Sequence, residues 1–338
     1  MIVNMKPVLF LCILLLASSC MKEIDLEHMR PAPKLVLNSV ASNGEILKAS
    51  LSRTWFYTDG KPNQLLEARI GLYVNDQFKE EMSLNMDAND YYSFGNYVAS
   101  YIPVSGDKVR IEVEKGGFNS LLAETTVPYK PELISLKAES FIRDDYYGST
   151  QSRFKITFRD EPTVGNCYLI MVYRGEPHYE YDDYEAPPIY QDEYYWHKEY
   201  VDYSSDPVFE NKISILDKVM GNDWLSGGGG RPFSDELFNG KEYTMTLKGN
   251  SSYGYNPGYP YLEERLPDSV RVYLYTITEP YYKYLSALTS LYDGSLNNDL
   301  ADIGLAEPVR VFCNIDGGLG ILGAACVDSL TVVVPKAN

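Results

Sequence analysis

The chain has 338 residues, 45% hydrophobic and 23% charged, which is long enough for two ordinary domains with apolar cores. Its formal net charge of −17 argues against a nucleic-acid partner, because lysine and arginine must neutralise phosphates there. The 30 tyrosines, against 12 phenylalanines and 3 tryptophans, are the unusual feature. Tyrosine suits half-buried strands and wet contact surfaces, since one end of its ring is apolar and the other hydrogen-bonds to water.

The N-terminus predicts a lipoprotein signal peptide over residues 1–19. Lys6 precedes the apolar run "PVLFLCILLLASSC", which is too short for a membrane-spanning helix and ends in small residues before Cys20. This ending resembles a bacterial lipobox, in which a peptidase cuts before the cysteine and Cys20 then carries acyl chains. Each buried CH₂ group of such chains contributes about 0.8 kcal/mol to anchoring. The alternative is an ordinary signal peptide that leaves a free thiol.

Residues 20–33 form a polar, proline-containing segment that we interpret as a lipidated tether. The acidic residues Glu23 and Asp25 follow Cys20 closely and resemble the surface-export signal of Bacteroidetes lipoproteins. We therefore expect a protein that lipid holds in the outer membrane and that faces the extracellular side.

The segment 34–128 has the sequence signature of a β-sandwich. Short apolar runs rich in valine, isoleucine, leucine and tyrosine alternate with turn residues. The pair Asn43-Gly44 predicts a hairpin turn, and the alternation of apolar and charged residues over 109–114 predicts one buried and one wet face. About seven strands fit this segment, as in an immunoglobulin-like domain.

A second β-sandwich is predicted over residues 131–338, after the proline-containing stretch "PYKPE". The fold class is therefore mainly β, with two immunoglobulin-like sandwiches in tandem. Asn239-Gly240 predicts another hairpin. In the run "SVRVYLYTIT", valines and a leucine alternate with Arg271 and tyrosines, which predicts a core face and an outer face.

One amphipathic helix is predicted near 279–292, within the second sandwich. Thr278 can cap it, Pro280 suits its first turn, and tyrosines and leucines recur at three and four residues. The chain then ends in the strand "PVRVFCNID", a glycine-rich turn and the terminal strand "SLTVVVP".

Two tyrosine-rich stretches, 176–207 and 250–268, are interpreted as loops of this second sandwich. Flat amphipathic rings make good contact surfaces, and loops at the ends of sandwiches carry function. The residues expected to bind a ligand or partner are Tyr181, Tyr184, Tyr190, Tyr194, Tyr195, Trp196, Tyr200, Tyr255 and Tyr259. The alternative is structural, because alternating tyrosine and acid also describes an exposed β-hairpin whose apolar side lies on the sandwich.

The first of these stretches also contains two histidines and several carboxylates. His178 and His197 lack the paired spacing of zinc sites, so no metal is predicted there. A weak calcium alternative rests on the oxygen donors of Asp182, Asp183 and Asp192, which do not follow the EF-hand spacing. A solvated acidic loop is the default interpretation.

Three cysteines follow Cys20 in the chain. Cys313 and Cys326 flank a glycine-rich stretch that could fold back, so a disulfide between them is predicted in an oxidising compartment. Cys167 is predicted to be a buried residue in a strand. The alternative is three buried free thiols.

Several stretches, in their order along the chain, resemble one known family. They are "KLVLNS", "VGNCYLIMV", "FSDELFNGKEY", "ITEPYYKYLSAL" and "PVRVFCNIDGGLGILGA", after a cysteine followed by acids. Together they cover nearly the whole mature chain and resemble the Bacteroidetes outer-membrane lipoproteins classed as domain of unknown function 4249. The resemblance implies a sandwich fold and an accessory role in nutrient uptake through a TonB-dependent transporter. It does not supply any catalytic residues.

The sequence contains no recognised catalytic motif. There is no G-x-S-x-G or H-E-x-x-H, and "SGGGGRP" lacks the Lys-Ser/Thr of a phosphate loop. We therefore expect no enzyme activity and no cofactor besides acylation of Cys20, with a hydrolase as the least favoured alternative. The first function hypothesis is a surface lipoprotein that captures an unknown ligand, or docks on a TonB-dependent transporter, through the tyrosine-rich loops. The second is a structural or adhesive cell-surface subunit without a ligand of its own.

Overall fold

The computed structural model describes residues 28, 30–56, 58–59, 67–85, 96–142, 150–163, 165–180, 189–212, 226–227, 230–249, 267–292 and 309–335. Two compact units divide the chain: one joins the N-terminal segment up to Pro33 with Thr54–Pro62, and the other holds the remainder. Within the small unit, the Arg30 guanidinium lies over the Phe56 ring at 4.6 Å and pairs with Asp59 at 2.7 Å. All strands described below belong to the large unit.

The first part of the large unit contributes eight strands. They are β1 (Leu35–Ser42), β2 (Lys48–Arg53), β3 (Arg69–Val74), β4 (Gln77–Glu81), β5 (Ser83–Leu84), β6 (Tyr97–Val98), β7 (Lys108–Glu114) and β8 (Leu121–Thr126). Strands β4, β3, β7 and β8 form a four-stranded sheet in that order. The predicted hairpin at Asn43-Gly44 is confirmed, since β1 and β2 pair antiparallel around it and Gly44 has a φ of 82°.

The second part supplies ten strands and one α-helix among the described residues. The strands are β9 (Glu132–Ile142), β10 (Thr150–Arg159), β11 (Cys167–Glu180), β12 (Ile189–Lys198), β13 (Val201–Asp202), β14 (Ser226–Gly227), β15 (Arg231–Ser234), β16 (Glu242–Gly249), β17 (Ser269–Ile277) and β18 (Leu319–Val333). Helix α3 spans Glu279–Tyr292, as predicted, and two 3₁₀ helices, η2 and η3, span Tyr203–Ser205 and Pro207–Lys212. The fold is therefore mainly β.

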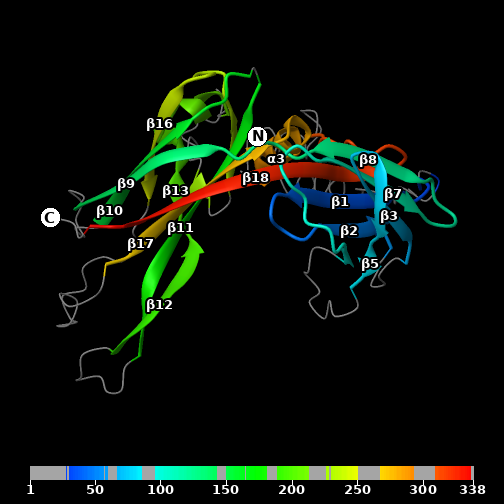
Figure 1. Ribbon diagram of the computed structural model, residues 1–338, viewed down its shortest axis with the longest axis horizontal. Coiled ribbons are helices and arrows are strands. Elements are labelled where there is room, and N and C mark those ends of the chain that lie inside the picture. Colours follow the sequence, from blue (N-terminus) through cyan, green and yellow to red (C-terminus); the bar gives the residue numbers. More distant parts are fainter. Residues whose placement is uncertain are drawn as a thin grey trace, which may run out of the picture. The chain divides into compact units, whose positions relative to one another are not determined.

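Strand β18 connects the two predicted segments within one sheet. Its first half runs parallel to β1, from Val36↔Leu319 to Ser42↔Ala325, and its second half runs antiparallel to β17. Figure 1 shows this strand passing from the neighbourhood of β1 to that of β17. The resulting nine-stranded sheet has the order β12-β11-β17-β18-β1-β2-β6-β5, with β15 beside β11. The sheet thus crosses the boundary predicted at 128–131.

Two apolar cores lie where this large sheet meets the smaller sheets. The first combines β1, β2 and β18 with the four-stranded sheet, and the alternating side chains Val109, Ile111 and Val113 are all inside it, as predicted. The second combines β11 and β17 with the five-stranded sheet β14-β13-β16-β10-β9. Because Leu322 and Ala324 of β18 belong to the first core, the end of the chain completes the segment 34–128.

The Asn239-Gly240 pair does not form the predicted hairpin. It turns the chain between β15 and β16, but β15 pairs with β11 in the large sheet and β16 with β10 in the five-stranded sheet. The turn therefore carries the chain from one layer to the other, and its sequence signal is compatible with both outcomes.

Helix α3 is fixed to β18 by its first residues. The Thr278 hydroxyl accepts from the amide of Ala324 at 3.2 Å, so this side chain connects the residue before the helix to β18. Its carbonyl accepts from the amide of Tyr282 at 2.9 Å and so begins the helix. The ring of Tyr281 packs on Gly323, where an added Cβ would lie 2.7 Å from a ring carbon.

Gly317 and Gly318 form a short turn, but from Leu319 the chain runs as a strand through Cys326 and does not fold back towards Cys313 as predicted. Cys313 Sγ lies 3.8 Å from the Gly318 carbonyl, while Cys326 lies seven residues beyond Leu319, about 23 Å farther along β18 at 3.3 Å per residue. A disulfide requires Cα atoms within about 7 Å. The predicted bond between Cys313 and Cys326 is therefore not formed, and both cysteines, like Cys167, are free thiols.

Gly320 makes the close pairing of β18 with β1 possible. Its φ of +112° is one that side-chain-bearing residues rarely adopt, and an added Cβ would lie 2.0 Å from the Leu37 carbonyl oxygen. A shift of either backbone to make room for a Cβ atom would break hydrogen bonds between β18 and β1.

We expect Gly320→Ala to lower the free energy of unfolding by about 2–4 kcal/mol, because it adds backbone strain and a clash at the shared strand. Urea unfolding followed by circular dichroism measures this loss. Gly116→Ala is the matched control, since an added Cβ there has nothing within 4 Å. Equal stability of the two variants would contradict the role given to Gly320.

Candidate binding surface on the β11–β12 hairpin

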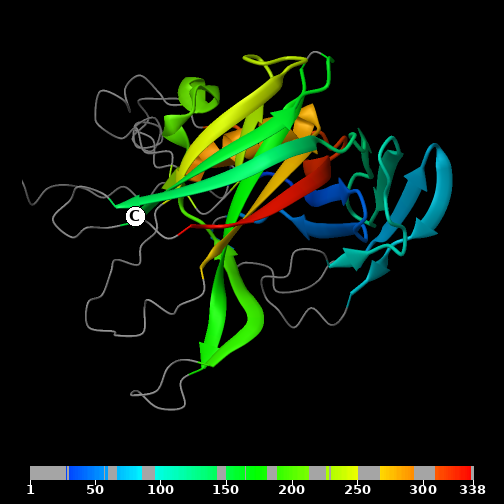
Figure 2. The same ribbon diagram turned by 60° about the vertical axis from the view of Figure 1, so that its left-hand side comes forward.

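The first tyrosine-rich stretch is largely a β-hairpin. Strands β11 and β12 pair antiparallel from Tyr173↔Lys198 to Glu180↔Ile189, with an irregularity between Pro177 and Tyr179. Figure 2 shows these two strands extending together from the large sheet. The structure thus contains the β-hairpin that the alternation of tyrosine and acid suggested as an alternative to a loop. Successive side chains along each of its strands point to opposite faces.

The described residues include only part of the predicted binding set. Tyr194, Tyr195 and Trp196 lie on β12, and Tyr200 follows its end. The backbone of Tyr190 lies opposite Tyr179, and that of Asp192 is also in β12. The other predicted residues lie outside the described part of the chain: Tyr181, Tyr184, Tyr255, Tyr259, Asp182 and Asp183.

Tyr195 and Tyr200 are the large aromatic side chains that this region presents to solvent. Their exposed fractions are 71% and 64%, whereas most tyrosines in the described segments are at least half buried. Tyr195 lies opposite Glu176 on the hairpin, next to His197, whose Nε2 is 3.8 Å from a Glu176 oxygen. An exposed ring beside a carboxylate and an imidazole can form both apolar and hydrogen-bonded contacts.

Trp196 points to the opposite face of the hairpin. Its indole lies across Gly175, where an added Cβ would be 3.0 Å from the ring. The guanidinium of Arg271 on β17 is 4.2 Å from the indole centroid, and the Tyr194 ring is 6.1 Å from it. The two faces of the hairpin are therefore chemically different.

The two histidines do not meet. His197 lies opposite Arg174, and His178 is four residues farther along β11, about 13 Å away at 3.3 Å per residue. One metal ion cannot bind both imidazoles at that separation. No group of three or more histidine, cysteine or acidic residues in the described ranges is arranged to hold a metal ion.

Buried charges fix the root of the hairpin to both sheets. Arg174 Nε donates to Glu199 at 2.5 Å, and its two terminal nitrogens donate to Asp268 at 3.1 Å and to the Ser152 hydroxyl at 3.2 Å. These residues come from β11, the end of β12, the start of β17 and β10. Both Arg174 and Glu199 are buried. The cluster thus connects the base of the hairpin to β10 of the five-stranded sheet and to the start of β17 in the large sheet.

The carboxylate of Glu199 is only partly satisfied. Its Oε1 atom is buried and has no hydrogen-bond partner among the residues that the structure describes, while Oε2 accepts from Arg174. Burial raises the pKa of this carboxyl, and the charge of Arg174 opposes that rise. Such a pair depends strongly on each partner, because either charge alone would be costly in this place.

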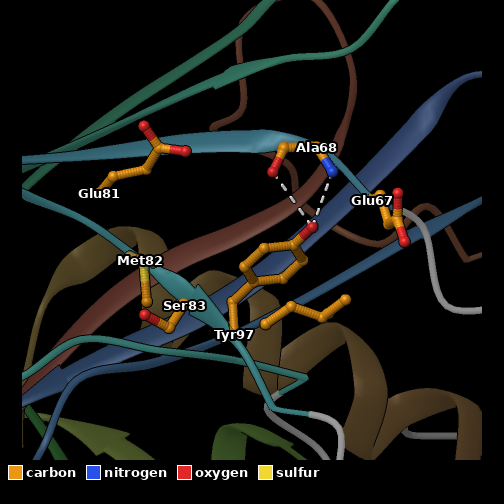
Figure 3. A pocket seen from close by; sticks show the side chains of 7 residues that line it. Glu67, Ala68, Glu81, Met82, Ser83 and Tyr97 are labelled. Carbon is orange, nitrogen blue, oxygen red and sulfur yellow. Dashed lines mark hydrogen bonds between the residues drawn. The ribbon is translucent and has the colours of Figure 1, made fainter.

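A cavity of about 440 Å³ lies at the first core (Figure 3) and is lined by Glu67, Ala68, Glu81, Met82, Ser83, Leu84 and Tyr97. The Tyr97 hydroxyl accepts from the Ala68 amide at 2.8 Å and donates to its carbonyl at 3.2 Å. Burial raises the pKa of this phenol. Tyr97 thus holds the backbone at the start of β3.

A second cavity, of about 300 Å³, brings together three stretches that carry the family resemblance. It is lined by Gly165, Cys167, Ser234, Asp235, Glu236, Glu279, Tyr282 and Lys283. Asp235 accepts from the amides of Gly165 and Asn166, and Lys283 pairs with Glu279 at 2.7 Å. Sequence reasoning did not identify this meeting point, although it singled out each stretch separately.

We expect Arg174→Met to destabilise the protein by about 3–5 kcal/mol, because Glu199 and Asp268 then lose their buried cation. The double variant Arg174→Met/Glu199→Leu removes the central pair and should recover a large part of the loss. Urea unfolding of the three proteins checks this expectation. A single variant as stable as the double variant would show that the pair does not hold the hairpin root.

The described helices include none that is long and apolar enough to cross a membrane. A search of curated proteins found no match. A family profile, that of a domain of unknown function (DUF4249), matches residues 22–331, which is most of the chain and includes the first core, the hairpin and most of β18. The chain therefore belongs to the DUF4249 family.

Proposed function

We propose that this protein is a surface lipoprotein of the Bacteroidetes outer membrane that assists a TonB-dependent transporter. Acyl chains on Cys20 hold it in the membrane, and residues 20–33 tether the folded part. It binds a ligand or docks on the transporter through the β11–β12 hairpin. We further propose that the two cores are immunoglobulin-like sandwiches that share β18.

One observation carries the proposal: Tyr195 on the hairpin and Tyr200 just after it are exposed, and buried ionic contacts tie the base of the hairpin to the core. Tyr195 and Tyr200 expose most of their side chains, and the cluster around Arg174 fixes the strands that carry them. Rigid aromatic anchors bind partners well because little side-chain entropy is lost on association. A purely solvated hairpin would not need such large apolar surfaces or a buried ionic root.

The alternative is a structural or adhesive surface subunit without its own ligand. In that case the same tyrosines would serve assembly between copies or between cells. The two functions differ in whether the hairpin is needed for uptake of a nutrient.

We expect Tyr195→Ser/Tyr200→Ser to abolish copurification with the transporter from native outer membranes, because it removes the two exposed rings without touching a core. Affinity purification followed by mass spectrometry measures the association. Tyr129→Ser is the matched control, since Tyr129 is 72% exposed outside the hairpin. Transporter recovery unchanged in the double variant would overturn the docking role, and self-association lost instead would favour the structural alternative.

We expect the mature protein to begin at Cys20 and to carry acyl chains. Intact-mass measurement should show the added lipid mass, and Cys20→Ser should move the protein from the membrane fraction to the soluble fraction. An unmodified Cys20 in the wild-type protein would remove the anchor from the proposal.

A further inference from the structure

The outer face of the large sheet carries an unusual row of side chains beside the hairpin. The registers place Lys198, Tyr173, Arg271 and Thr331 side by side on β12, β11, β17 and β18. The neighbouring β17 residues Val270, Val272 and Leu274 face the second core, so Arg271 and Tyr273 between them face away from it.

Arg271 is held in place without being neutralised. Its Nε donates to the Thr331 hydroxyl at 2.9 Å, one terminal nitrogen lies 3.4 Å from the Tyr273 hydroxyl, and its flat face stacks on Trp196. Among the residues that the structure describes, no carboxylate lies within ion-pair distance of this guanidinium. The other terminal nitrogen of Arg271 has no hydrogen bond to the described residues.

Another stacked arginine shows the contrast. Arg110 lies over the Tyr73 ring at 4.3 Å, in a geometry similar to that of Arg271 over Trp196. Carboxylate oxygens of Glu112 and Glu124 lie 3.2 and 3.9 Å from its nitrogens. Arg110 is thus already neutralised within the protein, whereas Arg271 is not.

The acids nearest to Arg271 along the strands are engaged elsewhere. Asp268 accepts from Arg174 on the core side, and Asp328 accepts from Lys130 and from the Leu133 amide. Glu176 lies beside His197 on the other face of the hairpin. The row therefore carries two cations, Arg271 and Lys198, on a protein whose net charge is −17.

Aromatic rings surround this cationic position. Trp196 reaches Arg271 only because Gly175 has no side chain between them. Tyr173 packs edge-on against Tyr273 at 5.5 Å on the other side. The site offers the partly exposed indole of Trp196, phenolic hydroxyls and a guanidinium held by Thr331. This is the combination that binds a ring with one apolar face and a negatively charged substituent.

We propose that the outer face around Arg271 and Trp196 binds a ligand that carries a carboxylate on a ring, with the carboxylate on Arg271 and the ring on Trp196. Acidic sugars and aromatic acids share this chemistry. The inference rests on the proposed function, because it names the ligand class that the protein would capture, but its residues differ from Tyr195 and Tyr200.

Titration calorimetry of the folded mature chain tests the proposal. The probes are a galacturonic acid trisaccharide, a neutral galactose trisaccharide of equal length, and benzoate. At least one acidic probe should bind, with an affinity that falls as sodium chloride is raised. Arg271→Gln should weaken it by about tenfold or more, because a charge-assisted hydrogen bond contributes about 1.5–3 kcal/mol. Trp196→Ala should also weaken it, and Arg110→Gln should leave it unchanged.

The outcomes separate this inference from the proposed function. Binding of the trisaccharide alone identifies an acidic sugar, and binding of benzoate alone identifies an aromatic acid. No binding of either acid, equal binding of the neutral sugar, or full binding by a folded Arg271→Gln variant overturns the site. Arg271→Gln should still copurify with the transporter. If the wild type binds neither acid while Tyr195→Ser/Tyr200→Ser loses the transporter, the site is wrong and the docking role stands.

Discussion

The pairing of β18 with both β1 and β17 is the constraint on which the rest of the structure depends. A strand of 15 residues serves two cores, one on each half of its length. Its first half must approach β1 so closely that Gly320 cannot carry a side chain, and its middle must accept helix α3 against Gly323. Without this strand the large sheet would separate into two parts, and β17, which carries Arg271, would lose one of its two neighbours.

The hairpin combines two demands that usually conflict. It exposes large aromatic side chains, as a contact surface must, and yet it is held at its root by charges buried in the core. A buried ion pair is a weak source of net stability, but the loss of either charge is costly, so Arg174 and Glu199 tie the strands that carry them to each other. This connection suits the proposed contact surface, because rings that are in place before a partner arrives lose less entropy on binding.

Local patterns in the sequence predicted much of this arrangement. The stripe of tyrosines and leucines predicted helix α3, and the alternation over 109–114 and 269–277 predicted which side chains enter the cores. These features depend on neighbours a few residues apart, so periodicity alone reveals them. The same alternation placed Arg271 on the outer face.

Long-range pairings could not be predicted in this way. The parallel pairing of β1 with β18 joins residues almost 300 positions apart, and the contact of Arg174 with Glu199 depends on where a hairpin returns. The glycines of β18 were assigned to a turn because their composition suits turns, whereas their role is to let two backbones approach. The assignment of Cys313 and Cys326 to a disulfide failed for the same reason.

The shared strand also bears on how the protein folds after synthesis. The first core contains Leu322 and Ala324, so the segment that leaves the ribosome first cannot complete its sheet until the last segment is available. Contacts of such long sequence separation slow folding and leave strand edges unpaired for longer.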